Sequence, residues 1–308
     1  MKKNILALSL GMAMAASLLA GCGSSAEETT AAATEAAGTE AEAETEAEAE
    51  ETEAEETEAE AAEDTEAAAE AGDEDAEAGG TLIVGFDQDF PPMGFIGDDG
   101  EYTGFDLELA QEVASRLGLE YKPQPIAWDA KDMELESGSI DCIWNGFTME
   151  GREDDYTWSD PYMDNSQVFV VRNDSGITSA ADLAGKVVEV QIDSSGQKAL
   201  EANEELTDTF AQLITTPDYN TAFMDLEQGT VDAICMDVIV AGYQIQEREA
   251  DMTILEDEVA SESYGIGFKK GNTELRDKVN DTLKEMAADG TLAEISNKWF
   301  GTDVTTIK

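Results

Sequence analysis

The chain has 308 residues, which is enough for two domains and additional segments. Its 70 acidic residues outnumber its 17 basic residues, and the formal net charge of −53 excludes nucleic acid as a natural partner. The chain contains no His, the commonest metal ligand and general base, and we expect neither a metal site nor a cofactor.

Residues 1–21 predict a secretory signal. Two lysines precede an apolar, Ala-rich run over residues 5–20 that is too short for a comfortable membrane span. Residues 19–22, Leu-Ala-Gly-Cys, resemble a bacterial lipobox, in which Cys22 is lipidated and becomes the new N-terminus. We therefore expect a lipid anchor in the outer leaflet of the cytoplasmic membrane, facing the extracellular space or the periplasm. A retained transmembrane anchor is the alternative.

Residues 22–80 predict an acidic, disordered tether that begins at the lipidated cysteine. Residues 23–80 contain 23 acidic side chains and no basic one, and almost all their other residues are Ala, Thr and Gly. Glu residues four apart repel each other on a helix, and the segment has little apolar surface to bury. A role in binding cations or the cell wall is an open alternative.

The first elements of the folded part predict a strand, a helix and a second strand. Residues 81–85 form a short β-branched run that ends before two prolines. Residues 104–117 show apolar residues at helical spacing, with Asp106 as the candidate N-cap. A strand over residues 119–125 and a short helix over residues 129–137 follow.

Residues 140–152 are the centre of the sequence pattern. An apolar strand over residues 140–144 leads into a polar turn over residues 145–148, and Arg152 follows shortly after. Because a guanidinium can hold a carboxylate through two parallel hydrogen bonds, this pattern predicts a site for a small anion. A surface Arg after an ordinary loop is the alternative.

This strand has a second copy further along the chain. Residues 138–143 read Gly-Ser-Ile-Asp-Cys-Ile, and residues 229–234 read Gly-Thr-Val-Asp-Ala-Ile. Such a repeat indicates two similar α/β lobes, and open α/β sheets bind ligands beyond the carboxyl ends of their strands. Arg152 and Asp237 would then face each other across one cleft, as the carboxylate and ammonium of a free amino acid require.

The second lobe begins with a predicted strand over residues 167–171. A strand over residues 186–191 leads into the polar loop 192–196, which opens a helix whose free backbone N–H groups can bind a carboxylate. Further strands are expected over residues 252–255 and 264–268. Cys142 and Cys235 fall in core strands of different lobes, where we expect buried free thiols.

Several short motifs, weak singly and strong together, resemble one known family. They are Gly104-Phe105-Asp106-Leu107, Ser137-Gly138-Ser139-Ile140-Asp141, Thr148 with Arg152, Trp158-Ser159-Asp160-Pro161-Tyr162, Val231-Asp232-Ala233, Tyr264-Gly265-Ile266, Asp289-Gly290-Thr291 and Trp299-Phe300-Gly301. The stretch from residue 81 to residue 301 resembles the family 3 substrate-binding proteins of polar amino acid ABC importers. The glutamine-binding and lysine/arginine/ornithine-binding proteins are similar examples.

The resemblance implies an α/β fold of the type II periplasmic-binding-protein kind, a flytrap of two similar lobes. Lobe 1 would comprise residues 81–161 and 266–308, and lobe 2 residues 167–261. Residues 162–166 and 262–265 would form a two-segment hinge between the lobes.

The resemblance also implies a role for each of a set of residues around the ligand. Those expected at the α-carboxylate are Arg152 and the backbone N–H groups near Ser194 and Ser195. Those expected at the α-ammonium are Asp237, the Thr148 hydroxyl and the Gly146 carbonyl. Those expected around the side chain are the aromatic walls Phe90 and Trp128, with Asp87, Asn145, Gln191 and Met236 at its end. Core roles for the two aromatic residues and a turn role for Asp87 are the alternatives.

The sequence departs from the family pattern in three places. The spacing from Thr148 to Arg152 is one residue shorter than usual, which predicts a rearranged Arg loop. Lys131 and Asp132 stand where the family tends to be apolar. Asp193 occupies a position often held by Gly, and its charge is unfavourable beside a carboxylate site unless it points away.

The resemblance implies a binding protein and not an enzyme. It would capture a polar or cationic amino acid, or cystine, by lobe closure, and deliver it as a monomer to the permease and ATPase of an ABC transporter. No second basic residue stands among the site candidates, which argues against Glu or Asp as the ligand. The alternatives are a dehydratase on the same fold, a ligand-sensing domain and a lipoprotein that docks without a ligand.

Overall fold

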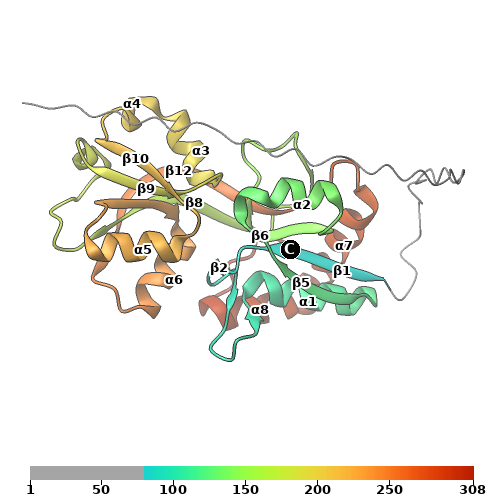
Figure 1. Ribbon diagram of the computed structural model, residues 1–308. Helices are drawn as coiled ribbons and strands as arrows, with labels where there is room; N and C mark the ends of the chain where they lie inside the picture. The colour runs from blue at the N-terminus through green and yellow to red at the C-terminus, as the bar shows by residue number, and fades with distance from the viewer. Residues whose placement is uncertain (1–79) are drawn as a thin grey trace, which may run out of the picture. The chain divides into compact units, whose positions relative to one another are not determined.

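The computed structural model describes residues 80–308, which form two α/β lobes (Figure 1). The expected signal over residues 1–21, the lipidation site Cys22 and the expected tether up to residue 79 lie outside the described residues. Within residues 80–308, no helix combines the length and the apolar character needed to cross a membrane.

Lobe 1 is built on the parallel strands β5, β1 and β6, in that order across the sheet. Its elements before the crossing to lobe 2 are β1 (Thr81–Phe86), β2 (Asp89–Phe90), β3 (Gly94–Ile96), β4 (Tyr102–Thr103), α1 (Phe105–Leu117), β5 (Glu120–Pro125), η1 (Trp128–Ala130), α2 (Lys131–Ser137), β6 (Cys142–Thr148) and β7 (Thr157–Trp158). After the return the lobe adds α7 (Thr273–Asp289) and α8 (Thr291–Phe300). The expected strands and helices are therefore present, with bounds shifted by a few residues.

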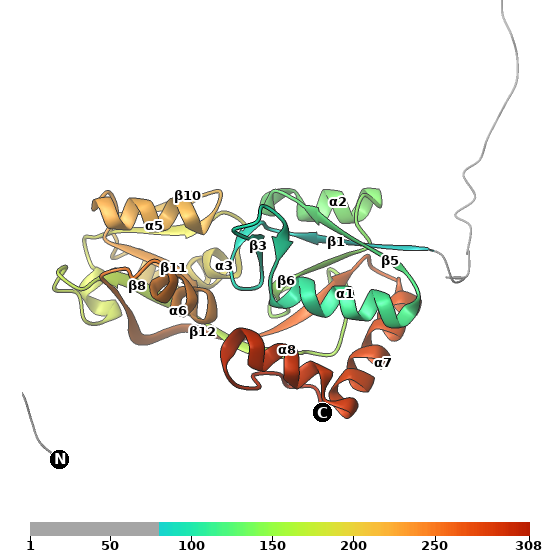
Figure 2. The same cartoon turned by 90° about the horizontal axis from the view of Figure 1, so that it is seen from below.

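Helices cover both faces of the lobe 1 sheet. Helices α1, α7 and α8 pack together on one face, and α2 packs on the other (Figures 1 and 2). Phe105, Val113 and Leu283 belong to the core under the first group, whereas Trp128 and Leu135 belong to the core under α2. Both faces of β6 are thus covered, and all seven of its residues are buried.

Lobe 2 repeats this layered arrangement. Its elements are β8 (Met163–Arg172), η2 (Ala180–Leu183), β9 (Val187–Gln191), α3 (Ser195–Ala202), α4 (Glu204–Thr207), β10 (Gln212–Thr216), α5 (Tyr219–Gln228), β11 (Ala233–Asp237) and α6 (Val238–Glu247). Strands β10, β9 and β11 are parallel, and the second copy of the repeat supplies β11 just as the first supplies β6. Helices α5 and α6 pack on one face of the sheet and α3 on the other.

Two long antiparallel strands connect the lobes. Strand β12 (Met252–Phe268) pairs with β8 of lobe 2 and then with β6 of lobe 1. The expectation of two separate strands over residues 252–255 and 264–268 is wrong, because irregular register between Ile254 and Ala260 bends β12 without breaking its pairing with β8. The two segments expected to act as the hinge pair with each other in this ladder, for example Glu262 with Asn165.

The expected polar turn over residues 145–148 is also wrong, because β6 continues to Thr148. The last two of these residues pair with β12, with Tyr264 opposite Thr148 and Gly265 opposite Phe147. Gly146 has a φ of 55°, in the left-handed region, and it lies within the irregular part of the ladder, opposite the segment between Gly265 and Gly267. Residues 145–148 have the polar, Gly-containing composition of a turn, but they are the buried end of strand β6.

The sequence predicted that Asp106 is the N-cap of α1, and this prediction is wrong. Gly104 is the cap residue, and the Asp106 side chain is completely buried. Its Oδ2 accepts hydrogen bonds from the Gly146 N–H at 2.6 Å and from the Tyr162 hydroxyl at 2.8 Å. Asp106 therefore holds the backbone of β6 at Gly146 through a buried hydrogen bond. Cys142 and Cys235 are buried free thiols, as expected.

Asp106 makes a specific contribution to the pH dependence of stability. Burial raises its pKa to about 7, although the hydrogen bonds from Gly146 and Tyr162 oppose that shift. Because the folded-state pKa lies above the unfolded value, the folded protein retains a proton between about pH 4 and 7 that the unfolded chain has lost. The free energy of unfolding then falls as pH rises through this window, by at most about 1.4 kcal/mol per pH unit.

We predict that Asp106→Asn makes this decline shallower, because the variant has no proton to lose at this position. Urea unfolding of parent and variant at several pH values between 4 and 7 measures the difference in slope. The exposed Asp98→Asn is the matched control and should keep the slope of the parent. Equal slopes in all three proteins would contradict the assignment of the shift to Asp106.

Candidate functional site

A small cavity is lined by side chains from both lobes. The structure places all eleven residues that the sequence analysis proposed as ligand contacts around it, namely Asp87, Phe90, Trp128, Asn145, Gly146, Thr148, Arg152, Gln191, Ser194, Ser195 and Asp237. Their roles toward a ligand remain predictions. Met236, which was also expected there, instead packs into the core of β11.

The cavity lies at strand ends because the strands of each lobe are parallel. Asp87 follows β1, and the last residues of β6 bring Gly146 and Thr148 to the same edge. In lobe 2, Gln191 ends β9 and Asp237 ends β11. Polar groups that follow the carboxyl ends of parallel strands gather at one edge of each sheet, and here both edges border the same cavity.

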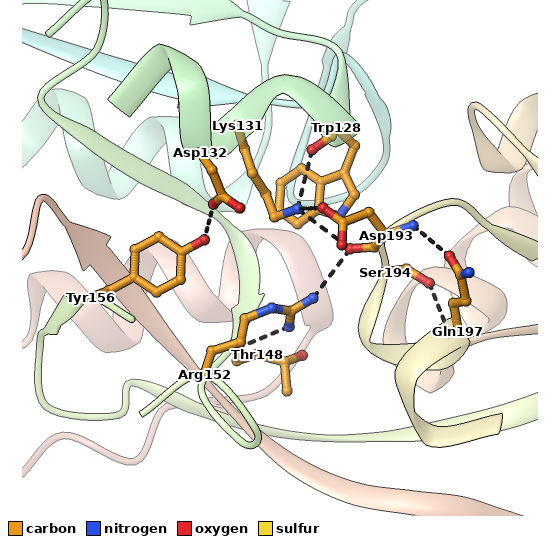
Figure 3. Close-up of polar contacts among 9 residues, drawn as sticks. All are labelled: Trp128, Lys131, Asp132, Thr148, Arg152, Tyr156, Asp193, Ser194 and Gln197. Carbon is orange, nitrogen blue, oxygen red and sulfur yellow. Dashed lines mark hydrogen bonds and ion pairs between the residues drawn. The ribbon is translucent and has the colours of Figure 1, made fainter. Parts of the chain in front are cut away.

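Arg152 lies at one end of the cavity with its side chain buried. Its Nη1 donates to the Thr148 carbonyl at 3.3 Å, and its Nη2 donates to the Asp193 carbonyl of lobe 2 at 3.2 Å (Figure 3). The guanidinium carbon lies 5.1 Å from the centre of the Phe147 ring. The shorter spacing from Thr148 to Arg152 therefore still allows both residues to reach the cavity.

The start of helix α3 lies beside Arg152. Ser194 is its N-cap and accepts a hydrogen bond from the Gln197 N–H at 3.1 Å. As the first helical residue, Ser195 has a backbone N–H without an intrahelical acceptor. Asp193, just before the cap, has a φ of 55°, which explains why Gly suits this position. Its carboxylate points to Lys131 and not into the cavity (Figure 3).

Asp237 supplies the negative charge of the site, and it is also buried. Its Oδ1 accepts hydrogen bonds from the Tyr264 hydroxyl at 2.6 Å and from the Asn165 amide at 2.7 Å. Burial raises the pKa of Asp237, although the hydrogen bond from Tyr264 opposes that shift. The same Asn165 amide donates to Glu262 at 2.6 Å, and burial, with the nearby charge of Asp237, raises the pKa of Glu262 to about 8.

Asp87 and Gln191 meet across the cavity from different lobes. The Gln191 amide donates to Asp87 Oδ2 at 2.6 Å, and the Asp89 N–H donates to Asp87 Oδ1 at 2.9 Å. Asp87 thus has both the turn role and the cavity position that the sequence allowed. Burial raises its pKa to about 6.

The two aromatic walls belong to larger aromatic groups. The Phe90 ring centre lies 6.0 Å from that of Tyr219, and the Trp128 ring packs edge-on against Phe147 with centres 5.5 Å apart. Both rings are therefore held by core contacts while they line the cavity. The core and cavity roles that the sequence offered as alternatives coexist.

Three buried polar atoms among the cavity-lining residues have no hydrogen-bond partner within residues 80–308. They are Asn145 Nδ2, Thr148 Oγ1 and Arg152 Nε. An unsatisfied buried donor or acceptor costs about 1–3 kcal/mol, so native proteins retain few of them. All three belong to residues that line one cavity, where a polar ligand or water could pair with them. No group of three or more His, Cys, Asp or Glu residues in this part of the chain is arranged to hold a metal ion.

Comparison with known proteins identifies the family. The profile of the bacterial extracellular solute-binding proteins, family 3, matches residues 82–302. The chain belongs to this family. Both the expected family and the expected type II periplasmic-binding-protein fold are confirmed.

Individual relatives of this family 3 solute-binding protein carry more specific names. The L-cystine-binding protein TcyJ of Escherichia coli strain K12 is 36% identical over 229 residues, which cover 73% of this chain and 85% of TcyJ. The arginine-binding extracellular protein ArtP of Bacillus subtilis strain 168 is 32% identical over 225 residues, which cover 71% of this chain and 86% of ArtP. A solved substrate-binding protein of an ABC uptake transporter from Streptococcus pneumoniae, with bound histidine, is 38% identical with a TM-score of 0.72 and covers 73% of this chain and 94% of its own.

The sequence analysis of this solute-binding protein missed the partners of Asp237. Tyr264 and Asn165 both lie in the segments expected to form the hinge, where the sequence suggested only a connection. The motif Tyr264-Gly265-Ile266 contains Tyr264 but gave no indication of its role in the site, and no motif contains Asn165. The pairing of β8 with β12 brings them together, and such long-range pairing was not visible in the repeat.

A substitution at Gly146 tests how tightly the side chains around this part of the cavity are packed. A Cβ there would approach the rings of Phe90 and Tyr264 to within 3.0 and 3.1 Å, in addition to the cost of its positive φ. We predict that Gly146→Ala lowers the free energy of unfolding by clearly more than the roughly 1 kcal/mol expected from backbone strain alone. Denaturant unfolding at neutral pH measures the loss.

Gly151→Ala is the matched control for this prediction. Gly151 also has a positive φ, of 75°, but a Cβ there would meet no atom within 4 Å. The difference between the two variants isolates the crowding at the cavity. An equal loss of stability in both would show that the contacts around Gly146 can relax at no cost.

Proposed function

We propose that this chain captures a free amino acid between its lobes and delivers it to the permease of an ABC transporter. The observation that carries the proposal is the placement of Arg152 and Asp237, a buried guanidinium from lobe 1 and a buried carboxylate from lobe 2, around one cavity. The names of the relatives support it, since they include a cystine-binding and an arginine-binding protein. The histidine-bound structure from S. pneumoniae supports it as well.

In the proposed complex, Arg152 holds the α-carboxylate. Its Nε has no protein partner within residues 80–308, and its two terminal nitrogens make only long bonds to carbonyls. Bidentate pairing with a carboxylate is stronger than such bonds because both partners are charged. The free N–H at the start of α3, at Ser195, adds a second donor next to Ser194.

The α-ammonium would lie at Asp237. The Thr148 hydroxyl, which has no partner within the described residues, and the Gly146 carbonyl complete the set of acceptors around it. The Gly146 N–H donates to Asp106, so the buried carboxyl holds the peptide that precedes this carbonyl. An ammonium has three donors, which matches three acceptors.

The side chain of the ligand would extend toward Phe90, Trp128 and Asp87. An acidic group between aromatic walls suits a cationic or amide side chain. Gln191, hydrogen-bonded to Asp87, can accept or donate there. Cystine is the second candidate, favoured by the similarity to TcyJ.

We further propose that the protein acts outside the cytoplasmic membrane, attached through lipid on Cys22, as a monomer and without catalysis. Membership in an extracellular solute-binding family supports the location, and the names of the relatives, which are binding proteins, support the lack of turnover. Mass spectrometry of the N-terminus after membrane extraction tests the lipid. A turnover assay with prephenate-like substrates tests the dehydratase alternative.

Replacing Arg152 by Ala should remove a charge-assisted contact to the carboxylate. We predict a loss of at least tenfold in affinity, since such a bond contributes about 1.5–3 kcal/mol. A thermal-shift screen of the twenty amino acids with cystine and ornithine identifies the ligand, and calorimetry with that ligand measures the loss.

Arg116→Ala is the control for Arg152→Ala. Arg116 pairs with Glu112 and Asp289 on the surface of lobe 1 and does not line the cavity. Its variant should bind the ligand with the affinity of the parent. Affinity of the Arg152→Ala variant within twofold of the parent would refute the carboxylate role.

The pH dependence of binding should distinguish a cationic side chain from a neutral one. Because the pKa of Asp87 is about 6, this residue loses its charge as pH falls from 7 to 5. Affinity for a cationic ligand should therefore fall over this range more steeply in the parent than in Asp87→Asn, in which Asn can still accept from Gln191. Titrations of both proteins at several pH values measure the two slopes, and for a cationic ligand equal slopes would contradict contact with Asp87.

A further inference from the structure

Lys131 and Asp193 form an ion pair across the cleft (Figure 3). Lys131 is the first residue of α2 in lobe 1, and Asp193 lies between β9 and α3 in lobe 2. Of the ten ion pairs within residues 80–308, this pair joins the two lobes, and the other nine each lie within one lobe. The two residues are also two of the places at which the sequence departs from the family pattern.

The Lys131 ammonium depends on lobe 2 for its counter-charge. Lys131 is only 1% exposed. Within its own lobe its Nζ has the Trp128 carbonyl at 3.3 Å and the Trp128 ring, whose centre lies 5.2 Å away. Its remaining partners are the carboxylate and the carbonyl of Asp193. A buried charge is costly unless it is paired, so this arrangement favours the state in which Asp193 is in place.

Asp193 is held by two cations of lobe 1 at the same time. Its carbonyl accepts from Arg152 Nη2 at 3.2 Å, while its carboxylate faces Lys131. Its own N–H donates to the Gln197 side chain at 2.6 Å, which ties the residue to α3. The positive φ of Asp193 lets the carbonyl and the carboxylate reach these different partners.

The neighbouring residue, Asp132, offers a contrast within lobe 1. It accepts a hydrogen bond from the Tyr156 hydroxyl, and both residues belong to lobe 1 (Figure 3). Opening of the lobes would leave that bond intact, whereas it would break the contact between Lys131 and Asp193. The two adjacent charges of α2 therefore differ in their coupling to lobe movement.

We infer that Lys131 and Asp193 act as a latch that stabilises the closed form of this protein and slows release of its ligand. Neither residue lines the cavity, so both act by positioning. The latch holds the loop before α3 against Arg152, next to the proposed carboxylate site. The effect on ligand release rests on the proposed function, whereas the effect on lobe closure does not.

A double-mutant cycle in the full-length chain tests the latch. The variants are Lys131→Gln, Asp193→Asn and their combination, and Asn is chosen because it tolerates a positive φ. Spin labels on p-acetylphenylalanine at the exposed positions Met133 in α2 and Met224 in α5 report the distance between the lobes without using cysteines. Double electron–electron resonance then measures the closed population with and without ligand.

We expect each single variant to lower the closed population and the double variant to lower it no further, since either change alone breaks the pair. With the ligand identified by the screen, stopped-flow fluorescence should show a dissociation rate constant at least fivefold higher and an association rate constant within twofold of the parent. Asp132→Asn should match the parent in both measurements. Circular dichroism confirms that each variant is folded, and Asp193→Asn, whose side chain is 37% exposed, provides the variant least prone to misfold.

Additive effects of the two substitutions, or an unchanged closed population in both single variants, would overturn the latch. Unchanged release by these variants, together with lost binding in Arg152→Ala, would overturn the latch and leave the proposed function in place. If no amino acid binds the parent protein, the proposed function fails, and the ligand-free distance distributions still decide whether the pair holds the lobes together.

Discussion

The structure depends on two opposite charges that are buried without counter-charges of their own. Arg152 contacts the carbonyls of Thr148 and Asp193, and Asp237 contacts the Tyr264 hydroxyl and the Asn165 amide. Neither residue forms an ion pair within residues 80–308. Desolvated charges held only by neutral dipoles are costly, and a zwitterion placed between them would satisfy both at once.

The strands that connect the lobes also shape one end of this site. Asn165 on β8 and Tyr264 on β12 bond directly to Asp237, and Glu262 shares the Asn165 amide. Any rotation about these strands would therefore move the groups that orient Asp237. In the proposed function, capture and lobe closure would be coupled, because the connection and the proposed ammonium site use the same residues.

Much of the fold and of the site could be predicted because both follow from local patterns. The repeat of six residues predicted two lobes, and the rule that ligands lie beyond strand ends predicted that Arg152 and Asp237 meet, whereas the other site residues were implied by the resemblance to the family. The errors have physical reasons: residues 145–148 look like a turn but are buried in β6, and Asp106 looks like a cap but supports Gly146. The partners of Asp237 depend on the register between β8 and β12, which no local pattern specifies.

Lys131 and Asp193 show why single departures from a family pattern mislead. A buried lysine on α2 is unfavourable alone, and an aspartate beside a carboxylate site is unfavourable alone. When the two residues pair, each charge offsets the cost of burying the other. The Asp193 carboxylate turns toward Lys131, and the Asp193 carbonyl accepts from Arg152. The positive charge that Lys131 brings near the site is thereby neutralised, so Arg152 remains the lining cation of the cavity. The pair changes the contact between the lobes while it preserves the charge that the proposed ligand meets.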